Sequence, residues 1–172
     1  MKKKNEDITV IITLYKTPIA NLINLNQYKN FKNILFEQES SVLTKKKLKK
    51  NLHFEFKYYS SKKNIGLSKS SNFLLKKVNT KYCLFTQADI KISEKSINQL
   101  QELLSENKEA IFVGPNFKKN KSKKYSFIKK LNAACMMCDV KKLFFQNLAI
   151  INGILKFLKF YLLKKFFSLL NN

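Results

Sequence analysis

Short apolar runs alternate with stretches of helical spacing along most of the chain. A short, continuous run rich in β-branched or aromatic residues and bounded by polar residues is typical of a buried strand. Runs of this kind occupy residues 8–14, 33–38, 54–59, 81–86 and 110–114. The stretches between them predict helices over about 18–28, 42–51, 68–78 and 94–106. Strands that alternate with helices form a parallel sheet with helices on both faces, so we expect a doubly wound, mostly parallel α/β fold.

The composition fits one ordinary folded domain with a strongly basic surface. The chain has 172 residues, of which 45% are hydrophobic, and this is enough to build a sizeable core. Its 34 basic residues against 11 acidic residues give a formal charge of +23, and every basic residue is Lys. A surface of Lys without Arg favours general attraction to anions over bidentate recognition of phosphates or bases. A nucleotide bias of the gene is the alternative explanation, because Lys, Asn, Ile and Phe all have A/T-rich codons.

The cysteines match neither a disulfide framework nor a metal site. Cys83, Cys135 and Cys138 are too few to form a framework in a chain of this length, and they fit a reducing compartment. Cys135 and Cys138 have C-x-x-C spacing, but a zinc site needs a second ligand pair and the single His, His53, is remote in sequence. We therefore expect buried cysteines. The N-terminal segment lacks the pattern of a signal peptide, and no segment has the ~20 clean apolar residues of a membrane span.

Polar residues follow the predicted strands at the positions where parallel sheets bind ligands. In open α/β sheets, ligands bind outside the carboxyl ends of the strands. Tyr15, Glu37 and Asp89 lie at or just after the ends of three of these strands, and residues 64–66 follow another. An acid at a strand end is unfavourable unless it is paired, bound to a metal or hydrated. Asp89 is therefore either a ligand for a divalent cation or a cap for the following turn.

Five short motifs in this order resemble those of a known enzyme family. They are Leu14-Tyr15-Lys16, Glu37-Gln38-Glu39-Ser40, the segment NIGLSKSSN with Asn64, Gly66 and Asn72, Gln87-Ala88-Asp89, and Val113-Gly114-Pro115. Together they resemble the nucleotide-sugar-binding half of family-2 glycosyltransferases, which have the GT-A fold. The fourth motif is similar to the Asn-Pro-Asp of the rhamnosyltransferase-like members. The resemblance covers about residues 7–143 and implies a sheet of the GT-A type that ends after the donor-binding half.

The resemblance implies a role in donor binding for each matching residue. Glu37 stands where the family's Asp meets the nucleoside, and Tyr15 lies in the turn that lines the base pocket. Asn64, Gly66 and Asn72 belong to the segment that approaches the diphosphate and the sugar. Gly66 also has a physical reason to be Gly, because backbone that approaches a ligand closely often needs a positive φ.

Asp89 stands at the position of the family's metal-binding carboxylate, so the resemblance implies Mn²⁺ or Mg²⁺ as a cofactor. Such a metal neutralises the departing nucleoside diphosphate. The chain departs from the family at Gln87, which replaces an acid or Asn and leaves one carboxylate fewer for the metal. Glu37 is one methylene longer than the family's Asp, so either the nucleoside pocket is remodelled or this contact is lost.

The acceptor half of the family is not recognisable in the sequence. An inverting transferase needs a general base to deprotonate the acceptor hydroxyl, and in the family this base follows a Gly-Phe-Asp-Glu stretch. Residues 133–143 resemble the lead-in to that stretch, but residues 144–172 contain no acid, and Asp139, the last acid, does not match the base. We therefore expect a donor-binding domain over 1–143 and a basic, hydrophobic helical tail over 144–172. The tail is a frameshifted or truncated remnant, a membrane-contacting helix, or part of a protein whose base comes from a partner chain.

Two functions are consistent with these features. The first is a glycosyltransferase-like protein, a hexosyl- or rhamnosyltransferase if active, that transfers sugar from a nucleotide-sugar donor to a saccharide or lipid-linked acceptor in polysaccharide biosynthesis. Without its general base such a protein is inactive. The second is a basic protein that binds nucleic acid or a membrane surface without catalysis, although the chain has no motif for specific nucleic-acid recognition. We expect the protein in the cytoplasm, either free or in peripheral contact with the inner face of the cell membrane through residues 144–172.

Overall fold

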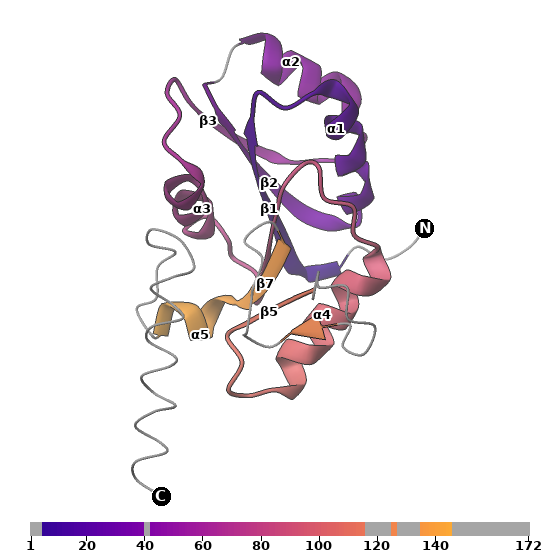
Figure 1. Ribbon diagram of the computed structural model, residues 1–172, viewed down its shortest axis with the longest axis vertical. Coiled ribbons are helices and arrows are strands. Elements are labelled where there is room, and N and C mark those ends of the chain that lie inside the picture. The colour runs from indigo at the N-terminus through magenta and orange to yellow at the C-terminus, as the bar shows by residue number, and fades with distance from the viewer. Residues whose placement is uncertain (1–4, 40–41, 116–124, 127–134, 146–172) are drawn as a thin grey trace, which may run out of the picture.

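A largely parallel sheet forms the centre of the molecule (Figure 1). The computed structural model describes residues 5–39, 42–115, 125–126 and 135–145. The strands in this part of the chain are β1 (Asn5–Tyr15), β2 (Phe31–Gln38), β3 (Lys57–Ser61), β4 (Tyr82–Thr86), β5 (Phe112–Pro115), β6 (Tyr125–Ser126) and β7 (Cys135–Asp139). These described strands follow the order β3-β2-β1-β4-β7-β5-β6 across the sheet. Strands β3, β2, β1 and β4 run parallel to one another, whereas β7 is antiparallel to both of its neighbours.

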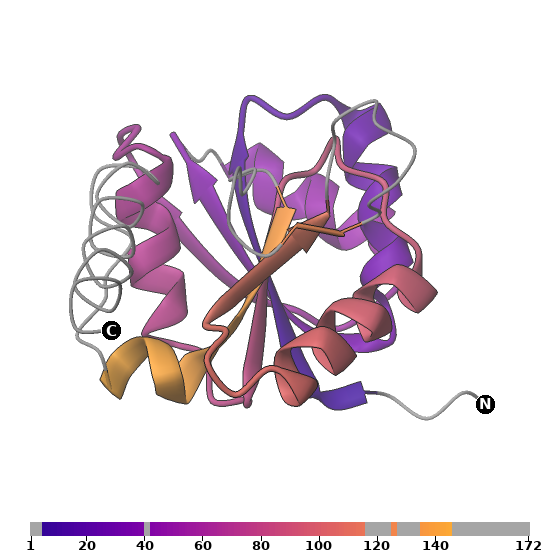
Figure 2. The same ribbon diagram turned by 60° about the horizontal axis from the view of Figure 1, so that its bottom comes forward.

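Helices cover both faces of the sheet, as expected for a doubly wound fold. They are α1 (Ile19–Asn24), the 3-10 turn η1 (Leu25–Tyr28), α2 (Val42–Asn51), α3 (Leu67–Leu75), α4 (Glu94–Glu106) and α5 (Val140–Phe145). Helices α1, α2 and α4 pack on one face, and α3 and α5 pack on the other (Figure 2). Each helix within the described ranges is too short or too polar to cross a membrane. The predicted α/β fold is confirmed, and nearly all of the predicted tail over 144–172 lies outside the described residues.

Strand β1 lies in the middle of the parallel strands, and both of its faces are buried. Val10, Ile12 and Leu14 belong to the core under α1, α2 and α4, whereas Ile11 belongs to the core under α3 and α5. Because side chains alternate along a strand, burial of both faces requires a continuous apolar run rather than an alternating one. Residues 8–14 have that pattern, which is why they predict a strand clearly.

Strand β7 departs from the regular alternation of strands and helices. It comes from the apolar segment 131–140, whose spacing alone favours neither a strand nor a helix. The strand inserts antiparallel between β4 and β5, with Cys138 opposite Cys83. Cys135 and Cys138 belong to the cores on opposite faces of the sheet, so their C-x-x-C spacing cannot hold one metal ion. All three cysteines are free and buried, as predicted.

Strand β3 begins at Lys57, later than the aromatic pattern predicts. Phe54 and Phe56 still pack against the core under α1 and α2, with ring centroids 6.0 Å apart. The backbone ladder to β2, however, begins only where Lys57 lies opposite Ile34. Apolar spacing shows which side chains are buried but not whether the backbone is paired. Consequently, in the described part of the chain, the first residues of β2 have no strand beside them on the β3 side.

We predict that Ile12→Ala lowers the free energy of unfolding by about 2–5 kcal/mol, because truncation of a large core side chain leaves a cavity. Ile12 is fully buried. Urea denaturation measures the change. The matched control is Ile23→Ala, which removes the same atoms from a side chain that is 54% exposed, and its effect should stay within about 0.5 kcal/mol. Equal losses for the two variants would contradict the position of Ile12 in the core.

Candidate functional site

A pocket lies at the edge of the sheet where the carboxyl ends of β1, β2 and β4 meet. Its volume is about 320 Å³. The lining consists of Thr13, Tyr15, Thr17, Pro18, Asn21, Gln38, Leu67, Gln87, Ala88 and Asp89. The parallel register sets Tyr15 beside Gln38, which brings the ends of β1 and β2 together. Two of the predicted site residues, Tyr15 and Asp89, therefore line a pocket at the edge where open α/β sheets bind ligands.

Gln38 connects the end of β2 to the turn before α3. Its side-chain Oε1 accepts hydrogen bonds from the backbone N–H groups of Ile65 and Gly66, both at 2.9 Å. The Oδ1 atom of Asn64 accepts a further bond from the same Gly66 N–H, also at 2.9 Å. Gly66 has a φ of 81°, in the left-handed region that favours glycine, so the turn depends on this residue. The sequence places Gln38 in the second of the five motifs but predicts no separate role for it, because its bonds to Ile65 and Gly66 form only in the fold.

Helix α3 begins at the pocket with an uncapped N-terminus. Leu67, its first residue, lines the pocket, and the preceding Gly66 provides no side-chain capping bond. The hydroxyl groups of Thr13 and Ser70 are 3.0 Å apart and join β1 to this helix. Asn72, another predicted site residue, is half-buried within α3 and is not among the described residues that line the pocket. The partial positive charge of a helix N-terminus favours an anion in the pocket.

Glu37 is buried in β2 and does not line the pocket. Its side chain is 4% exposed and points to the face of α1 and α2, because side chains alternate and Leu35 packs on that face. No hydrogen bond or ion pair to its carboxylate is found within the described residues. Burial raises the pKa of Glu37 to about 7, because the charged form loses hydration. At this strand end, Gln38 forms the pocket wall instead.

Asp89 is exposed, and the backbone around it is held by the 3-10 turn η1. The side chain of Gln27 makes two bonds to the segment that follows Asp89. Its Nε2 donates to the carbonyl oxygen of Ile90 at 2.8 Å, and its Oε1 accepts from the N–H of Ile92 at 2.9 Å. Gln27 was not recognised from the sequence, because its partners are distant along the chain and only the fold brings them together.

The pocket offers oxygen ligands but only one carboxylate. Nowhere in the described residues do three or more His, Cys, Asp or Glu side chains gather in a way that could hold a metal ion. Asp89 lines the pocket together with the carboxamide residue Gln87 and the hydroxyl residue Thr13. Mg²⁺ prefers oxygen ligands and is usually held by one or two carboxylates together with substrate phosphates. The residues present therefore fit a metal that a bound nucleotide helps to hold, and they do not fit a metal cage formed by the protein alone.

Two residues at this edge have left-handed backbone conformations without being Gly. Lys16 follows β1 and has a φ of 47°, and Glu39 follows β2 and has a φ of 53°. Such conformations are unfavourable for residues with side chains and cluster at functional sites. Lys16 Nζ lies 3.5 Å from Glu39 Oε2, so an ion pair joins the two strand ends, although an exposed pair contributes little stability. The Tyr15 hydroxyl, and then Glu39, raise the pKa of Lys16.

Asp139 lies at the opposite edge of the sheet from Asp89. It pairs with Tyr82, the first residue of β4, whereas Asp89 comes after the end of that strand. Its Oδ1 accepts a hydrogen bond from the N–H of Lys142 at 3.0 Å, so it caps the start of α5. Of the described residues that line the pocket, Asp89 is the only Asp, Glu or His. Glu39, another acid at this edge, is in the ion pair with Lys16, so the described lining of the pocket offers no general base separate from the candidate metal ligand.

The fold is similar to that of several solved proteins. A mannosyltransferase from Pyrobaculum calidifontis in complex with GDP-Man and Mn²⁺ has a TM-score of 0.65 and 13% identity, over 81% of this chain and 46% of its own. S. aureus TarS in complex with UDP-GlcNAc has a TM-score of 0.61 and 16% identity, and the match covers 83% of this chain and 48% of TarS. A cytidylyltransferase from Leptospira borgpetersenii has a TM-score of 0.53 and 13% identity, and the match covers 83% of this chain and 64% of the cytidylyltransferase. The predicted GT-A fold is confirmed, and the chain spans about half the length of the first two proteins.

The sequence also matches a family model, although no curated protein matches the chain. The model is that of glycosyl transferase family 2, and the match covers residues 9–167. It therefore extends beyond residue 143, where the resemblance in the motifs ends, and into the predicted tail. The matched region includes β1, the strand ends around the pocket, and α3. The chain belongs to glycosyl transferase family 2.

Proposed function

We propose that this chain binds a nucleotide-sugar donor in the pocket at the carboxyl edge of the sheet and that the sugar is transferred to a saccharide or lipid-linked acceptor. The observation that carries the proposal is the convergence of Tyr15, Gln38 and Asp89 on one pocket at this edge. Family membership supports glycosyl transfer as the reaction. Solved proteins of similar fold with bound GDP-Man and UDP-GlcNAc support a nucleotide-sugar as the donor.

Each part of the donor has residues of suitable chemistry in the pocket. The exposed ring of Tyr15 offers an apolar surface for the nucleoside base. The uncapped N-terminus of α3 offers backbone N–H groups and a partial positive charge to the diphosphate, and the Asn64–Gly66 turn, whose own Ile65 and Gly66 N–H groups are bonded to Gln38, positions that helix end. Asp89 would hold a divalent metal, Mn²⁺ or Mg²⁺, and such a metal would supply charge neutralisation of the leaving group. Asn72 of α3 and Glu37 of β2 are not among the described residues that line the pocket, so the proposal gives them no direct contact with the donor.

The transfer step needs one group that the described residues do not supply. The acceptor hydroxyl attacks the anomeric carbon, the bond from that carbon to the diphosphate breaks, and a general base takes the hydroxyl proton. In our proposal the base comes from a part of the protein outside the described ranges or from a partner chain, and a form that lacks it binds the donor without turnover. The setting is polysaccharide biosynthesis in the cytoplasm, with peripheral contact to the inner face of the membrane through residues 144–172.

We predict that Mn²⁺ increases the affinity of the protein for UDP or GDP at least about tenfold, because Asp89 would hold a metal that attracts the diphosphate. Asp89→Asn should abolish this increase, since an amide does not neutralise the cation. Isothermal titration with and without Mn²⁺ measures both effects. The matched control is Asp7→Asn, which removes an exposed carboxylate at the start of β1 and should leave the increase unchanged. An increase that persists in Asp89→Asn would show that the metal is held elsewhere.

We predict that Glu37→Gln makes the protein more stable than the wild type at pH 8 but not at pH 4.5. The pKa of Glu37 is about 7 in the folded protein against 4.5 without burial, so the folded state binds the proton more tightly. The stability that this group contributes is therefore present below about pH 4.5 and is lost as the pH rises to about 7. The gain of the variant at pH 8 should be about 1–3 kcal/mol by urea denaturation.

The control for this experiment is Glu109→Gln, which neutralises an exposed carboxylate. Its stability relative to the wild type should change little between pH 4.5 and pH 8. If the stability of Glu37→Gln relative to the wild type is equally independent of pH, the Glu37 carboxylate is hydrated in solution. That result would contradict the buried position of Glu37 in β2.

A further inference from the structure

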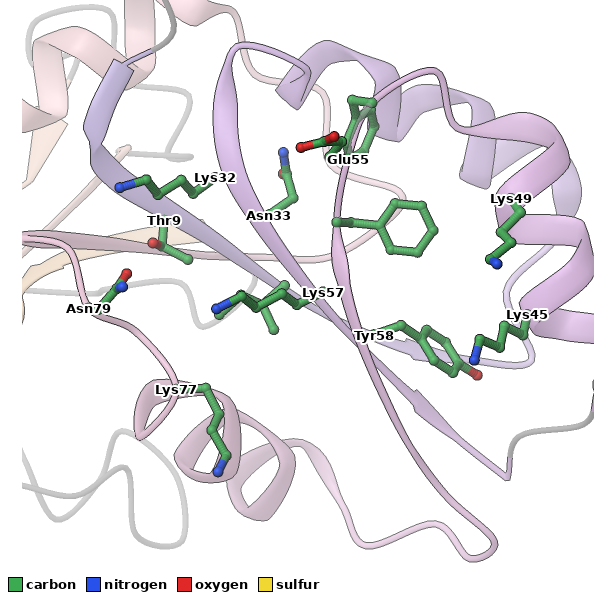
Figure 3. Close-up of a pocket in the computed structure, with 13 residues that line it drawn as sticks. Thr9, Lys32, Asn33, Lys45, Lys49, Glu55, Lys57, Tyr58, Lys77 and Asn79 are labelled. Atoms are coloured by element: carbon green, nitrogen blue, oxygen red, sulfur yellow. The ribbon is translucent and has the colours of Figure 1, made fainter.

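A second hollow lies at the other end of the parallel strands (Figure 3). Its volume is about 790 Å³, within the range of roughly 300–1,000 Å³ that is usual for ligand pockets. Its walls include Thr9 of β1, Lys32 and Asn33 at the start of β2, and Lys57 at the start of β3. The pocket proposed for the donor, which Tyr15, Gln38 and Asp89 line, is called the donor pocket below. It is formed at the carboxyl ends of the strands. The two hollows therefore open at opposite edges of one sheet.

The separation between the two hollows is too large for one small ligand to occupy both. Lys32 lines the second hollow and Gln38 lines the donor pocket, and both belong to β2. Six residues of extended strand span about 20 Å. A ligand in the second hollow is therefore distinct from the nucleotide-sugar donor.

The hollow exists because β3 is shorter than its aromatic pattern suggests. The ladder between β2 and β3 begins with Ile34 opposite Lys57. Ahead of that point, Phe54 and Phe56 pack against the core while their backbone stays off the β2 ladder. The start of β2 is consequently open on one side, and the gap is flanked by α2 on one face of the sheet and by the end of α3 on the other (Figure 3).

The two hollows differ sharply in charge. Five of the 13 residues that line the second hollow are Lys, and one is an acid, Glu55. Lys makes up 34 of the 172 residues of the chain, so this wall has nearly twice the average proportion of Lys. The donor pocket has no Lys among its described lining residues. A uniform nucleotide bias of the gene cannot by itself account for this difference between two hollows of the same sheet.

Three of these lysines lie on the α3 side of the sheet edge. Figure 3 shows Lys32, Lys57 and Lys77 on one side of β3, and Lys45 and Lys49 of α2 on the other. Within the described residues, no carboxylate lies within ion-pair distance of any of these three ammonium groups. The Lys77 ammonium lies over the Phe73 ring, 5.6 Å from its centroid, whereas Lys32 and Lys57 are like charges on the neighbouring strands β2 and β3 and repel one another. An anion bound between them would relieve this repulsion.

The wall of the hollow also contains a buried acceptor without a partner. Asn33 is 4% exposed, and its Nδ2 donates to the carbonyl oxygens of Tyr28 and Phe31 at 2.9 Å and 2.8 Å. Its Oδ1 is buried and has no hydrogen-bond partner in the described part of the chain. A buried polar atom that lacks a partner is unfavourable. This oxygen is an acceptor on the face of α1 and α2, where Leu35 also packs, so it cannot bind a phosphate oxygen. The attraction for an anion at the start of β2 therefore comes from the lysines.

We propose that this basic hollow is a second binding site, which takes the phosphate group of an anionic phosphate ester. Lys32 and Lys57 contact the phosphate, and Lys77 joins them when its ammonium group leaves the Phe73 ring, over which it lies 5.6 Å from the centroid. Lys45 and Lys49 add attraction from the other side of the sheet edge. The chemistry is shared by two sources, the headgroup of an anionic phospholipid and a soluble phosphate ester. Lys suits such a site because its ammonium group acts as a point charge on phosphate and needs no bidentate geometry.

The test compares two triple variants of equal charge. Lys32→Gln, Lys57→Gln and Lys77→Gln together remove the site, whereas Lys91→Gln, Lys95→Gln and Lys108→Gln remove three exposed lysines outside the hollow. Binding is measured to vesicles of phosphatidylglycerol mixed with phosphatidylcholine, to vesicles of phosphatidylcholine alone, and to glycerol 3-phosphate. The site triple should lose at least about tenfold in affinity for the anionic probe that the wild type binds. The control triple should lose less than about threefold.

The outcomes separate the two sources and the alternative of diffuse charge. Binding to the anionic vesicles alone identifies a lipid headgroup as the source, and binding to glycerol 3-phosphate identifies a soluble ester; both support the site. Equal losses in the two triples, or no binding of either anionic probe by the wild type, overturn it. The site triple should keep the wild-type circular dichroism spectrum and the wild-type affinity for nucleoside diphosphate, because the donor pocket lies at the opposite edge. A loss of either readout would show that the lysines support the fold rather than a separate site.

Discussion

The parallel pairing of β1 with β2 on one side and β4 on the other is the constraint on which the rest of the structure depends. In this register Ile11 lies opposite both Ile34 and Phe85, and the three strands end at the same edge of the sheet. Both faces of β1 are buried, so a slip of one residue would exchange its two apolar faces and is strongly disfavoured. The hydrophobic core thus sets the register, and the register sets where the residues after each strand lie.

The pocket at the carboxyl edge depends on polar side chains that tie its loops to this sheet. Gln38 holds the turn before α3, and Gln27 holds the segment after β4. Tyr28 adds a buried bond of 3.1 Å to the Thr86 hydroxyl at the end of β4. Burial raises the pKa of the Tyr28 phenol, so its hydroxyl stays neutral and remains a donor. Loops that are held at several points can present groups such as Asp89 to a ligand with little loss of entropy on binding.

Charge is distributed unevenly over the two edges of the sheet. The carboxyl edge has one carboxylate in the pocket lining, an exposed ion pair and a helix N-terminus, a combination that suits the proposed nucleotide and divalent cation. At the amino edge, lysines from three separate elements face a gap that β3 leaves open. The net charge of +23 therefore has a spatial arrangement that composition does not show. With this arrangement, one protein can combine the two functions that the sequence predicts as alternatives, because the proposed donor site and the proposed anion site lie at different edges of the sheet.

The sequence by itself determined the alternation of strands and helices and the edge of the sheet where the candidate pocket lies, because apolar spacing reports burial and parallel strands end together. It also identified Tyr15 and Asp89, since residues directly after buried strands can be located without a three-dimensional structure. The sequence did not reveal the antiparallel insertion of β7 or the late start of β3, because backbone pairing depends on neighbours that are remote in the chain. For the same reason, only the tertiary structure decided that Gln38 rather than Glu37 lines the pocket and that Gln27 holds the segment around Asp89. Strand alternation turns adjacent side chains to opposite faces, and only packing against the helices shows which face belongs to the site.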